Sequence, residues 1–141
     1  MAPFIVLIGS FFLSLLIGFD WQLSLRIAVA IMFLFTGIAH WGKRRPDLIK
    51  MVPPSLPNPG FIVTITGILE IVGALGLLIP GTARLASVCL AVLLVLMFPA
   101  NIRAAKHKIS IGGKRATPLL LRTVLQIIFL TSVILVGVYS T

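Results

Sequence analysis

Few side chains in this sequence are suited to chemistry, and the most informative is Glu70. It lies near the middle of the apolar run 61–79, about nine residues, or ~14 Å of helix, from either end. A carboxylate at that depth in hydrocarbon is costly unless it is paired or protonated. Glu70 is therefore expected to face the interior of a helical bundle. There it would be a proton site, an acceptor for a ligand, or a buried interhelical hydrogen bond that only fixes the packing.

Four other polar side chains stand near the ends of neighbouring apolar runs. They are His40, Asn101, Arg122 and Gln126. If the chain alternates across a membrane, all four belong to one half of the bundle, with Glu70 at mid-depth below them. Polar groups that converge from four helices are typical of a binding site. The alternative is a polar network that only holds the core together.

Other kinds of site have little support in the sequence. One of the two histidines, His107, stands between lysines, so neither a bis-histidine haem nor a metal site is expected. The single cysteine, Cys89, excludes an internal disulfide and a CxxC pair, and we expect no catalytic part for it. No intrinsic cofactor is expected, and a redox role would need a partner or a diffusible cofactor such as a quinone.

The composition indicates which elements must position these residues. The chain has 141 residues, of which 59% are hydrophobic and 11% charged, whereas soluble domains carry about 25% charged residues. So short a chain cannot hide that much apolar surface from water, which indicates an integral membrane protein. The net charge of +9 would suggest nucleic acid for a soluble protein. Here it indicates topology and contact with anionic lipid, and no nucleic acid is expected.

Five apolar runs are long enough to span a bilayer core, which takes about 20 residues. They are residues 3–19, about 23–41, 61–79, 83–101 and 118–139. These runs show no period-2 alternation, so the sequence predicts an all-α membrane bundle with five spans. Residues 1–19 would alternatively be a cleaved signal peptide. Retention is favoured because no positive charge precedes the run and no small-x-small cleavage site follows it.

Basic residues are distributed very unevenly over the predicted loops. Ten lie at one side of the bundle and two, Arg26 and Arg84, at the other. The ten are Lys43, Arg44, Arg45, Lys50, Arg103, Lys106, Lys108, Lys114, Arg115 and Arg122. The positive-inside rule then places both long loops and the N-terminus in the cytoplasm and the C-terminus outside.

The two long loops differ in character. Residues 46–60 hold a Pro-Pro pair and further prolines, which predicts an extended backbone. This loop would form a rim over the cytoplasmic mouth of the bundle or a plain stiff connector. Residues 103–115 carry five positive charges and are expected to touch anionic lipid, with a protein partner as the alternative.

Five motifs follow one another in a fixed order. They are Phe-Leu-Phe-Thr-Gly-Ile-Ala-His at 33–40, Met-Val-Pro-Pro-Ser-Leu-Pro-Asn-Pro at 51–59, Gly-Ile-Leu-Glu-Ile-Val-Gly-Ala-Leu-Gly-Leu-Leu-Ile-Pro at 67–80, Arg84 with Phe-Pro-Ala-Asn-Ile at 98–102, and Leu-Arg-Thr-Val-Leu-Gln at 121–126. In this order they resemble the DoxX-like family of small bacterial membrane proteins, over about residues 23–130. Ser55 departs from the pattern, because an aromatic residue is frequent there.

The resemblance implies a four-helix core at residues 23–141, preceded by an added N-terminal helix at 1–22, in the bacterial inner membrane. Some DoxX-like relatives are membrane subunits of quinone-linked or thiol-linked oxidoreductase systems, including thiosulfate oxidation, and more distant animal relatives assist receptor assembly. The family's recurring polar positions correspond here to His40, Glu70, Asn101 and Gln126. None has a settled catalytic role in the family.

We therefore expect a small membrane subunit or accessory protein of a quinone- or thiol-linked oxidoreductase or detoxification system. It would bind a quinone-like or lipid-like molecule near Glu70 and His40; whether it is itself an enzyme is open. Expected partners are membrane lipids, a membrane or cytoplasmic oxidoreductase, or a second copy of the chain. The alternatives are a structural or assembly factor, and a small proton-coupled transporter, which the lack of an obvious inverted repeat disfavours.

Overall fold

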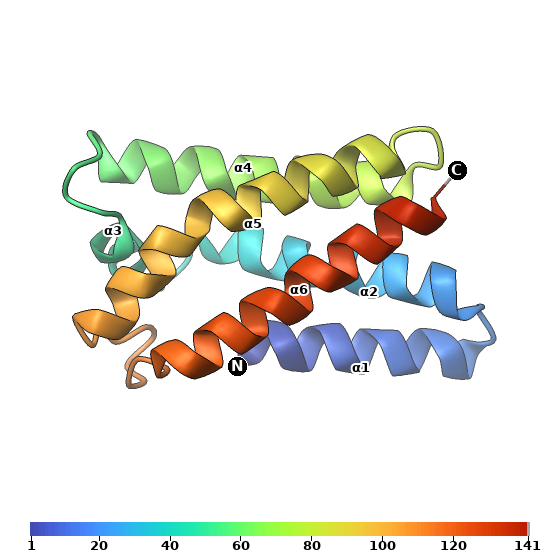
Figure 1. Cartoon of the computed structure of the whole chain (residues 1–141), viewed down its shortest axis with the longest axis horizontal. Helices are drawn as coiled ribbons and strands as arrows, with labels where there is room; N and C mark the ends of the chain where they lie inside the picture. The colour runs from blue at the N-terminus through green and yellow to red at the C-terminus, as the bar shows by residue number, and fades with distance from the viewer. Residues whose placement is uncertain (141) are drawn as a thin grey trace.

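The computed structural model describes residues 1–140 and consists of helices (Figure 1). The helices are α1 (Ala2–Ile17), α2 (Trp21–Ala39), α3 (Arg45–Met51), α4 (Pro59–Leu78), α5 (Ala83–Lys106) and α6 (Leu119–Tyr139). No strand is present between residues 1 and 140. Four helices, α2, α4, α5 and α6, are long and apolar enough to cross a membrane. The all-α class is confirmed, and the protein is a multi-pass membrane bundle.

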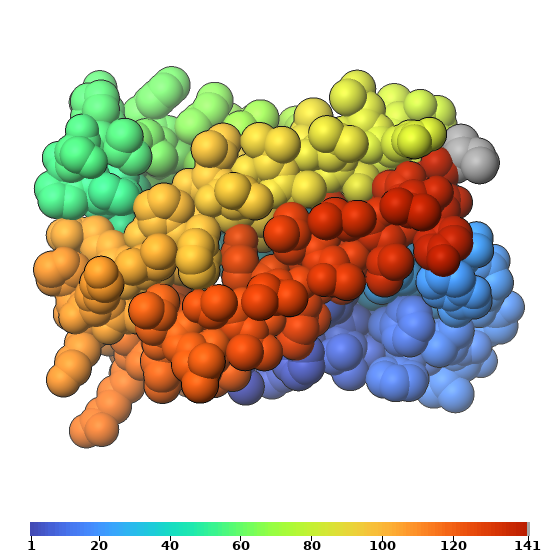
Figure 2. All heavy atoms as spheres, viewed as in Figure 1, coloured from blue at the N-terminus to red at the C-terminus, as the bar shows by residue number. Residues whose placement is uncertain are grey.

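The five long helices run lengthwise beside one another (Figure 1). In the bundle, α2 packs against α1 and α4, α4 packs against α5, and α5 packs against α6. One end carries the two tight turns, α1 to α2 and α4 to α5. The other end carries α3 and the segment 107–118, which projects beyond the helices at the left of Figure 2. Consecutive long helices are therefore antiparallel.

Local sequence explains the sharp turn between α1 and α2. Gly18 ends α1 with a φ of 108°, in the left-handed region that glycine adopts without steric cost. Asp20 caps α2, and its carboxylate accepts hydrogen bonds from the backbone N–H groups of Gln22 and Leu23 at 2.9 and 3.0 Å. Three residues, 18–20, therefore reverse the chain and set α1 against α2.

The proline-rich loop differs from the prediction of an extended segment. Its first part is the helix α3, which begins at Arg45 and has Pro46 in its first turn, where a missing N–H costs nothing. Asp47 in the first turn and Lys50 in the last turn complement the helix dipole. The later prolines follow the end of this helix. They are therefore compatible with a short helix before them and mark the point where α3 ends.

Two glycines allow α2 and α4 to approach closely. A Cβ added to Gly67 would lie 2.8 Å from the Cβ of His40, and one added to Gly37 would lie 2.8 Å from Cγ1 of Ile71. Small residues at helix contacts permit such close packing in membranes. This approach sets the last turn of α2 directly against the middle of α4, where Glu70 lies.

At the opposite end of the bundle, α5 and α6 are in equally close contact. The Ser87 hydroxyl donates a hydrogen bond of 2.5 Å to the carbonyl oxygen of Val133, and a Cβ on Gly137 would collide with Ser87. Toward the other end of these two helices, the long side chains of Arg122 and Gln126 on α6 hydrogen-bond to Asn101 and Leu94 on α5. The core of the bundle is apolar, with Ala28, Val29, Leu77 and Val133 fully buried.

Candidate functional site

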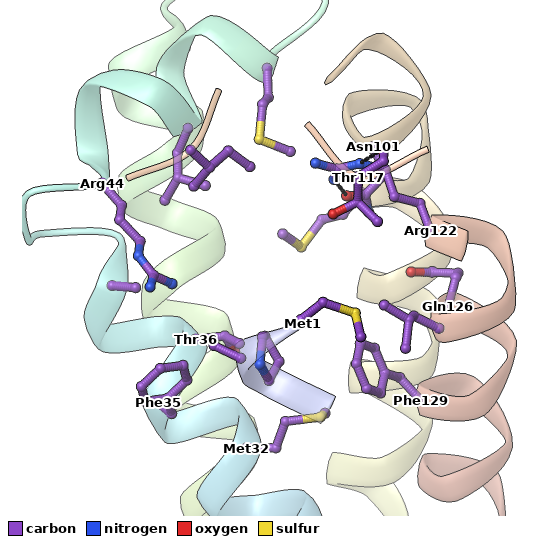
Figure 3. A pocket seen from close by; sticks show the side chains of 18 of the residues that line it. Met1, Met32, Phe35, Thr36, Arg44, Asn101, Thr117, Arg122, Gln126 and Phe129 are labelled. Carbon is purple, nitrogen blue, oxygen red and sulfur yellow. Dashed lines mark hydrogen bonds between the residues drawn. The ribbon is translucent and has the colours of Figure 1, made fainter. Parts of the chain in front are cut away.

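A cavity of about 400 Å³ lies at the end of the bundle that carries α3 and the segment 107–118 (Figure 3). Its walls are α2 and α4 on one side and α5 and α6 on the other, and Met1 at the start of α1 points into the space between them. The volume lies within the range of small-molecule sites, about 300–1,000 Å³. All five candidate residues, His40, Glu70, Asn101, Arg122 and Gln126, line this cavity.

The first wall holds Glu70, which is 3% exposed. Its Oε2 accepts a hydrogen bond of 2.6 Å from the Thr36 hydroxyl on α2. Its Oε1 lies 3.9 Å from Nε2 of His40, a separation too long for a direct hydrogen bond. The expectation that Glu70 faces the interior is confirmed, and its hydrogen-bond partner is Thr36.

The imidazole of His40 is held in a defined orientation. Its Nδ1 lies 2.9 Å from the backbone carbonyl oxygen of Thr36, which is only an acceptor, so Nδ1 carries a proton. In the neutral ring, Nε2 is then an acceptor directed at the carboxyl group of Glu70. Attraction between Nε2 and Oε1 therefore requires one further proton, on either group. The pair is a two-acceptor site that becomes a donor when that proton is added.

Arg45, which the sequence suggested only as a topology signal, supports this wall from outside the cavity. Its guanidinium donates hydrogen bonds to the carbonyl oxygens of His40 and Gly60, both at 3.0 Å, and to the Thr64 hydroxyl at 2.8 Å. These bonds tie the end of α2 to the first turns of α4. Arg45 thus fixes the backbone that carries His40.

The second wall holds the other three candidates, each paired locally. Nη1 of Arg122 donates to Oδ1 of Asn101 at 3.0 Å, and Nε2 of Gln126 donates to the carbonyl oxygen of Leu94 at 2.6 Å. Both bonds connect α5 with α6. The structure therefore places the candidates in two groups that face one cavity, and neither Asn101 nor Gln126 hydrogen-bonds to Glu70.

Apolar side chains make up most of the remaining lining. All four methionines of the chain line the cavity, together with phenylalanines from α2 and α6. These residues are Met1, Met32, Met51, Met97, Phe33, Phe35 and Phe129. Methionine is flexible and polarisable, so surfaces rich in it adapt to ligands of varied shape. No sequence motif marks this cluster, because its members come from five separate segments.

Four cationic side chains line the same cavity, and three of them, all except Arg122, were not predicted as part of the site. They are Arg44, Lys114, Arg115 and Arg122. Lys114 and Arg115 lie on the segment 107–118, in which Gly112 and Gly113 take positive φ angles and Ile111 pairs with Lys114. Within residues 1–140, no group of three His, Cys, Asp or Glu side chains is arranged to hold a metal ion.

The fold and the cavity together define a small multi-pass membrane protein with a mixed polar and apolar internal pocket. The chain belongs to the family described as Domain of unknown function (DUF8561), whose model matches residues 29–136. That match runs from α2 to α6 and includes both polar walls of the cavity. No curated protein and no solved structure matches the chain.

Proposed function

We propose that this protein binds an apolar or amphipathic small molecule, quinone-like or lipid-like, in the cavity beside Glu70 and His40. One observation carries the proposal: a buried Glu–Thr–His group on the wall of a pocket otherwise rich in methionine and phenylalanine. A concave, mostly apolar pocket with a few convergent polar groups is the usual form of a small-molecule site. The protein would be a DoxX-like accessory or subunit of a quinone- or thiol-linked oxidoreductase or detoxification system.

The protonation of the Glu70–His40 pair supports a ligand with oxygen functions. Without the extra proton, Nε2 and Oε1 are acceptors, which suits a ligand hydroxyl. With the proton, the pair donates, which suits a ligand carbonyl. A quinone and its quinol present these two functions, so one site would accommodate both forms. The resemblance to DoxX-like proteins supports the same ligand class.

The proposed topology has five spans with the cavity end in the cytoplasm. Ten of the twelve Lys and Arg residues lie in or next to the two long loops at that end, which favours its placement inside. The opposite end has Trp21 packed edge-on against Tyr139 with ring centroids 4.9 Å apart, as expected of aromatic residues at a membrane interface. We place the N-terminus inside, the C-terminus outside, and the protein in the bacterial inner membrane, with α1 as an addition to the core 23–141.

A pair of matched substitutions on α5 tests the proposal. Leu94 lines the cavity, whereas Leu96 is 70% exposed on the outer face of the same helix. Purified protein in a neutral detergent would be titrated with decylubiquinone and decylubiquinol, and binding followed by equilibrium dialysis. We expect saturable binding that Leu94→Trp abolishes by filling the cavity and that Leu96→Trp leaves unchanged. Equal loss in both variants, or no saturable binding, would refute binding of this ligand class.

Glu70→Gln tests the part played by the carboxyl group. The amide keeps an oxygen that accepts the Thr36 hydrogen bond, but it cannot hold the titrating proton. We expect the variant to fold with wild-type thermal stability in detergent and to lose ligand binding. A variant with full binding and full stability would reject the proton-holding role. Co-purification with a stable partner and an empty cavity would instead favour an assembly factor.

A further inference from the structure

We propose that the molecule bound in this cavity carries a compact acidic head group, a carboxylate or a phosphate, held between Arg44 and Arg122. Its apolar tail would extend over the methionine and phenylalanine side chains toward Glu70. This inference rests on the proposed function, because it names the chemical class of the ligand for the same cavity.

The first observation is an excess of positive charge that the protein does not neutralise. Arg44, Lys114, Arg115 and Arg122 all line the cavity, and Glu70 is the one carboxylate among the lining residues. Glu70 is engaged with Thr36. In the described part of the chain, no ion pair joins any of these four cations to a carboxylate.

The other two acidic residues are committed elsewhere. Asp20 caps α2 at the far end of the bundle. Asp47 accepts a hydrogen bond of 3.0 Å from the backbone N–H of Gly112 and lies 3.9 Å from Nζ of Lys50. The sequence therefore has no further acidic side chain to neutralise the cations of the cavity, and an external anion would do so.

The second observation is the presence of unused hydrogen-bond donors. Arg122 uses Nε for the carbonyl oxygen of Thr117 and Nη1 for Asn101, which fixes the plane of its guanidinium. Its Nη2 has no acceptor within residues 1–140, and neither has the guanidinium of Arg44. Figure 3 shows Arg44 and Arg122 reaching toward the cavity from opposite sides. Guanidinium groups bind carboxylate and phosphate oxygens with short, charge-assisted hydrogen bonds.

The amino group of Met1 reports the same positive field. Burial, followed by the positive charges of Arg122, Arg44 and Lys114, lowers the pKa of this amino group from its ordinary value. The cavity therefore disfavours an additional cation at the position where Met1 enters it. Burial disfavours either charge at this position, whereas the positive charges of Arg122, Arg44 and Lys114, the smaller contribution, favour an anion there.

The lining and the size of the cavity favour a single-chain amphiphile. Arg122 lies beside Thr117 and Asn101 and Arg44 stands on the opposite wall, while Met32 and Phe129 supply apolar surface deeper in the bundle (Figure 3). A volume of about 400 Å³ is small among ligand sites, which favours one short chain over a two-chain phospholipid. An acidic head and one apolar tail match the two halves of the lining.

Binding of three probes of equal chain length tests the inference. Dodecyl phosphate, dodecanoate and dodecanol would be titrated against the full chain in nanodiscs of phosphatidylcholine. We expect both acids to bind about tenfold or more tightly than dodecanol, the gain of one strong charge-assisted contact, with an advantage that shrinks as salt is raised. Equal affinity for the acids and the alcohol would overturn the acidic head group while leaving the proposed function intact.

Charge-neutralising variants locate the head group. Arg122→Gln and Arg44→Gln are each expected to weaken the acids about tenfold and to leave dodecanol binding unchanged. Lys106→Gln is the matched control, because it removes one exposed charge at the same end of the bundle without touching the cavity. Arg44→Gln keeps the test valid if loss of the Asn101 contact unfolds the Arg122 variant. An equal effect of Lys106→Gln would overturn the inference in favour of general surface attraction.

Two further experiments distinguish the possible sources of the acidic ligand. They also distinguish a failure of the acidic-head-group inference from a failure of the proposed function. Displacement of dodecyl phosphate by single-chain lysophosphatidylglycerol would support a lipid head group as the source of the anion, whereas displacement by dodecanoate alone would support a free fatty acid. Acid binding that survives Leu94→Trp would overturn the cavity as its location. A third outcome is that Leu94→Trp abolishes binding of dodecanol or decylubiquinone while the acids bind no more tightly than dodecanol. This outcome would overturn the acidic head group and leave the proposed function intact.

Discussion

The hydrogen bond between Thr36 and Glu70 leads to a quantitative prediction about stability. The Thr36 hydroxyl has one proton and two acceptors in reach, Oε2 of Glu70 at 2.6 Å and the carbonyl oxygen of Phe33 at 3.2 Å. Glu70 has no other hydrogen-bond donor among the described residues. Thr36→Val keeps the shape of the side chain and removes that donor, so a carboxyl group that is 3% exposed is left without a hydrogen bond.

The expected loss of stability in Thr36→Val follows from the known free-energy cost of leaving a buried polar group without a hydrogen bond. An unsatisfied buried polar group costs about 1–3 kcal/mol, and side-chain hydrogen bonds between membrane helices contribute roughly 0.6–2 kcal/mol. We therefore expect Thr36→Val to lower the free energy of unfolding by about 1–2 kcal/mol. Glu70→Met should cost less than about 1.5 kcal/mol, because its volume is similar and the Thr36 hydroxyl keeps its bond to Phe33.

The double variant distinguishes a true pair from two unrelated side chains. Thr36→Val combined with Glu70→Met leaves no unsatisfied polar group, so it should be more stable than Thr36→Val alone. Unfolding in detergent would be followed by tryptophan fluorescence for the wild type, both single variants and the double variant. A Thr36→Val protein as stable as the wild type, or a double variant whose loss equals the sum of the single losses, would refute the reasoning.

Three further predictions concern packing, reactivity and topology. Gly67→Ala should destabilise the protein by about 1–3 kcal/mol in the same unfolding assay, because the new Cβ would lie 2.8 Å from His40; Gly9→Ala, which meets no atom within 4 Å, should be neutral or stabilising. Cys89→Ala should retain stability and ligand binding, since Cys89 is exposed and does not line the cavity, and a loss of binding would contradict its exclusion from the site. In that background, Ser110→Cys should resist an impermeant maleimide applied to intact cells and react after lysis; labelling in intact cells would reverse the topology.

The long helices could be predicted because hydrocarbon restricts the backbone so strongly. A span must satisfy its own N–H and C=O groups, so each long apolar run becomes a helix. The residues at which the helices begin and end were less predictable. Helix α5 continues through Pro99 to Lys106, past the predicted end at residue 101, and α3 forms where proline density indicated an extended chain. At these positions, contacts with the rest of the bundle decide what local composition leaves open.

The candidate site was predictable only in part, for a related reason. The burial of Glu70 follows from the cost of exposing a carboxylate to lipid. The identity of its hydrogen-bond partner, Thr36, does not follow from that cost. The contact between Gly37 and Gly67 decides which face of α2 meets α4, and this contact brings Thr36 to Glu70. A cationic residue in a loop has the same sequence signature whether it faces water or a cavity. Arg44 could therefore be assigned to the cavity only from the structure.

Because methionine side chains gather around one cavity, their rate of oxidation should depend on whether a ligand fills that cavity. Peroxide converts the methionine thioether to a polar sulfoxide, and the reaction requires access of the oxidant to the sulfur. Apart from exposed Cys89 and Met1, which is 57% exposed, the oxidisable sulfur of this chain is that of Met32, Met51 and Met97 in the cavity lining. A short peroxide pulse on living cells, read out by peptide mass spectrometry, would therefore show whether the cavity is filled in its native membrane before the occupant has been identified. The same arrangement makes sustained oxidative damage a route by which the pocket would turn polar and lose its affinity for apolar tails.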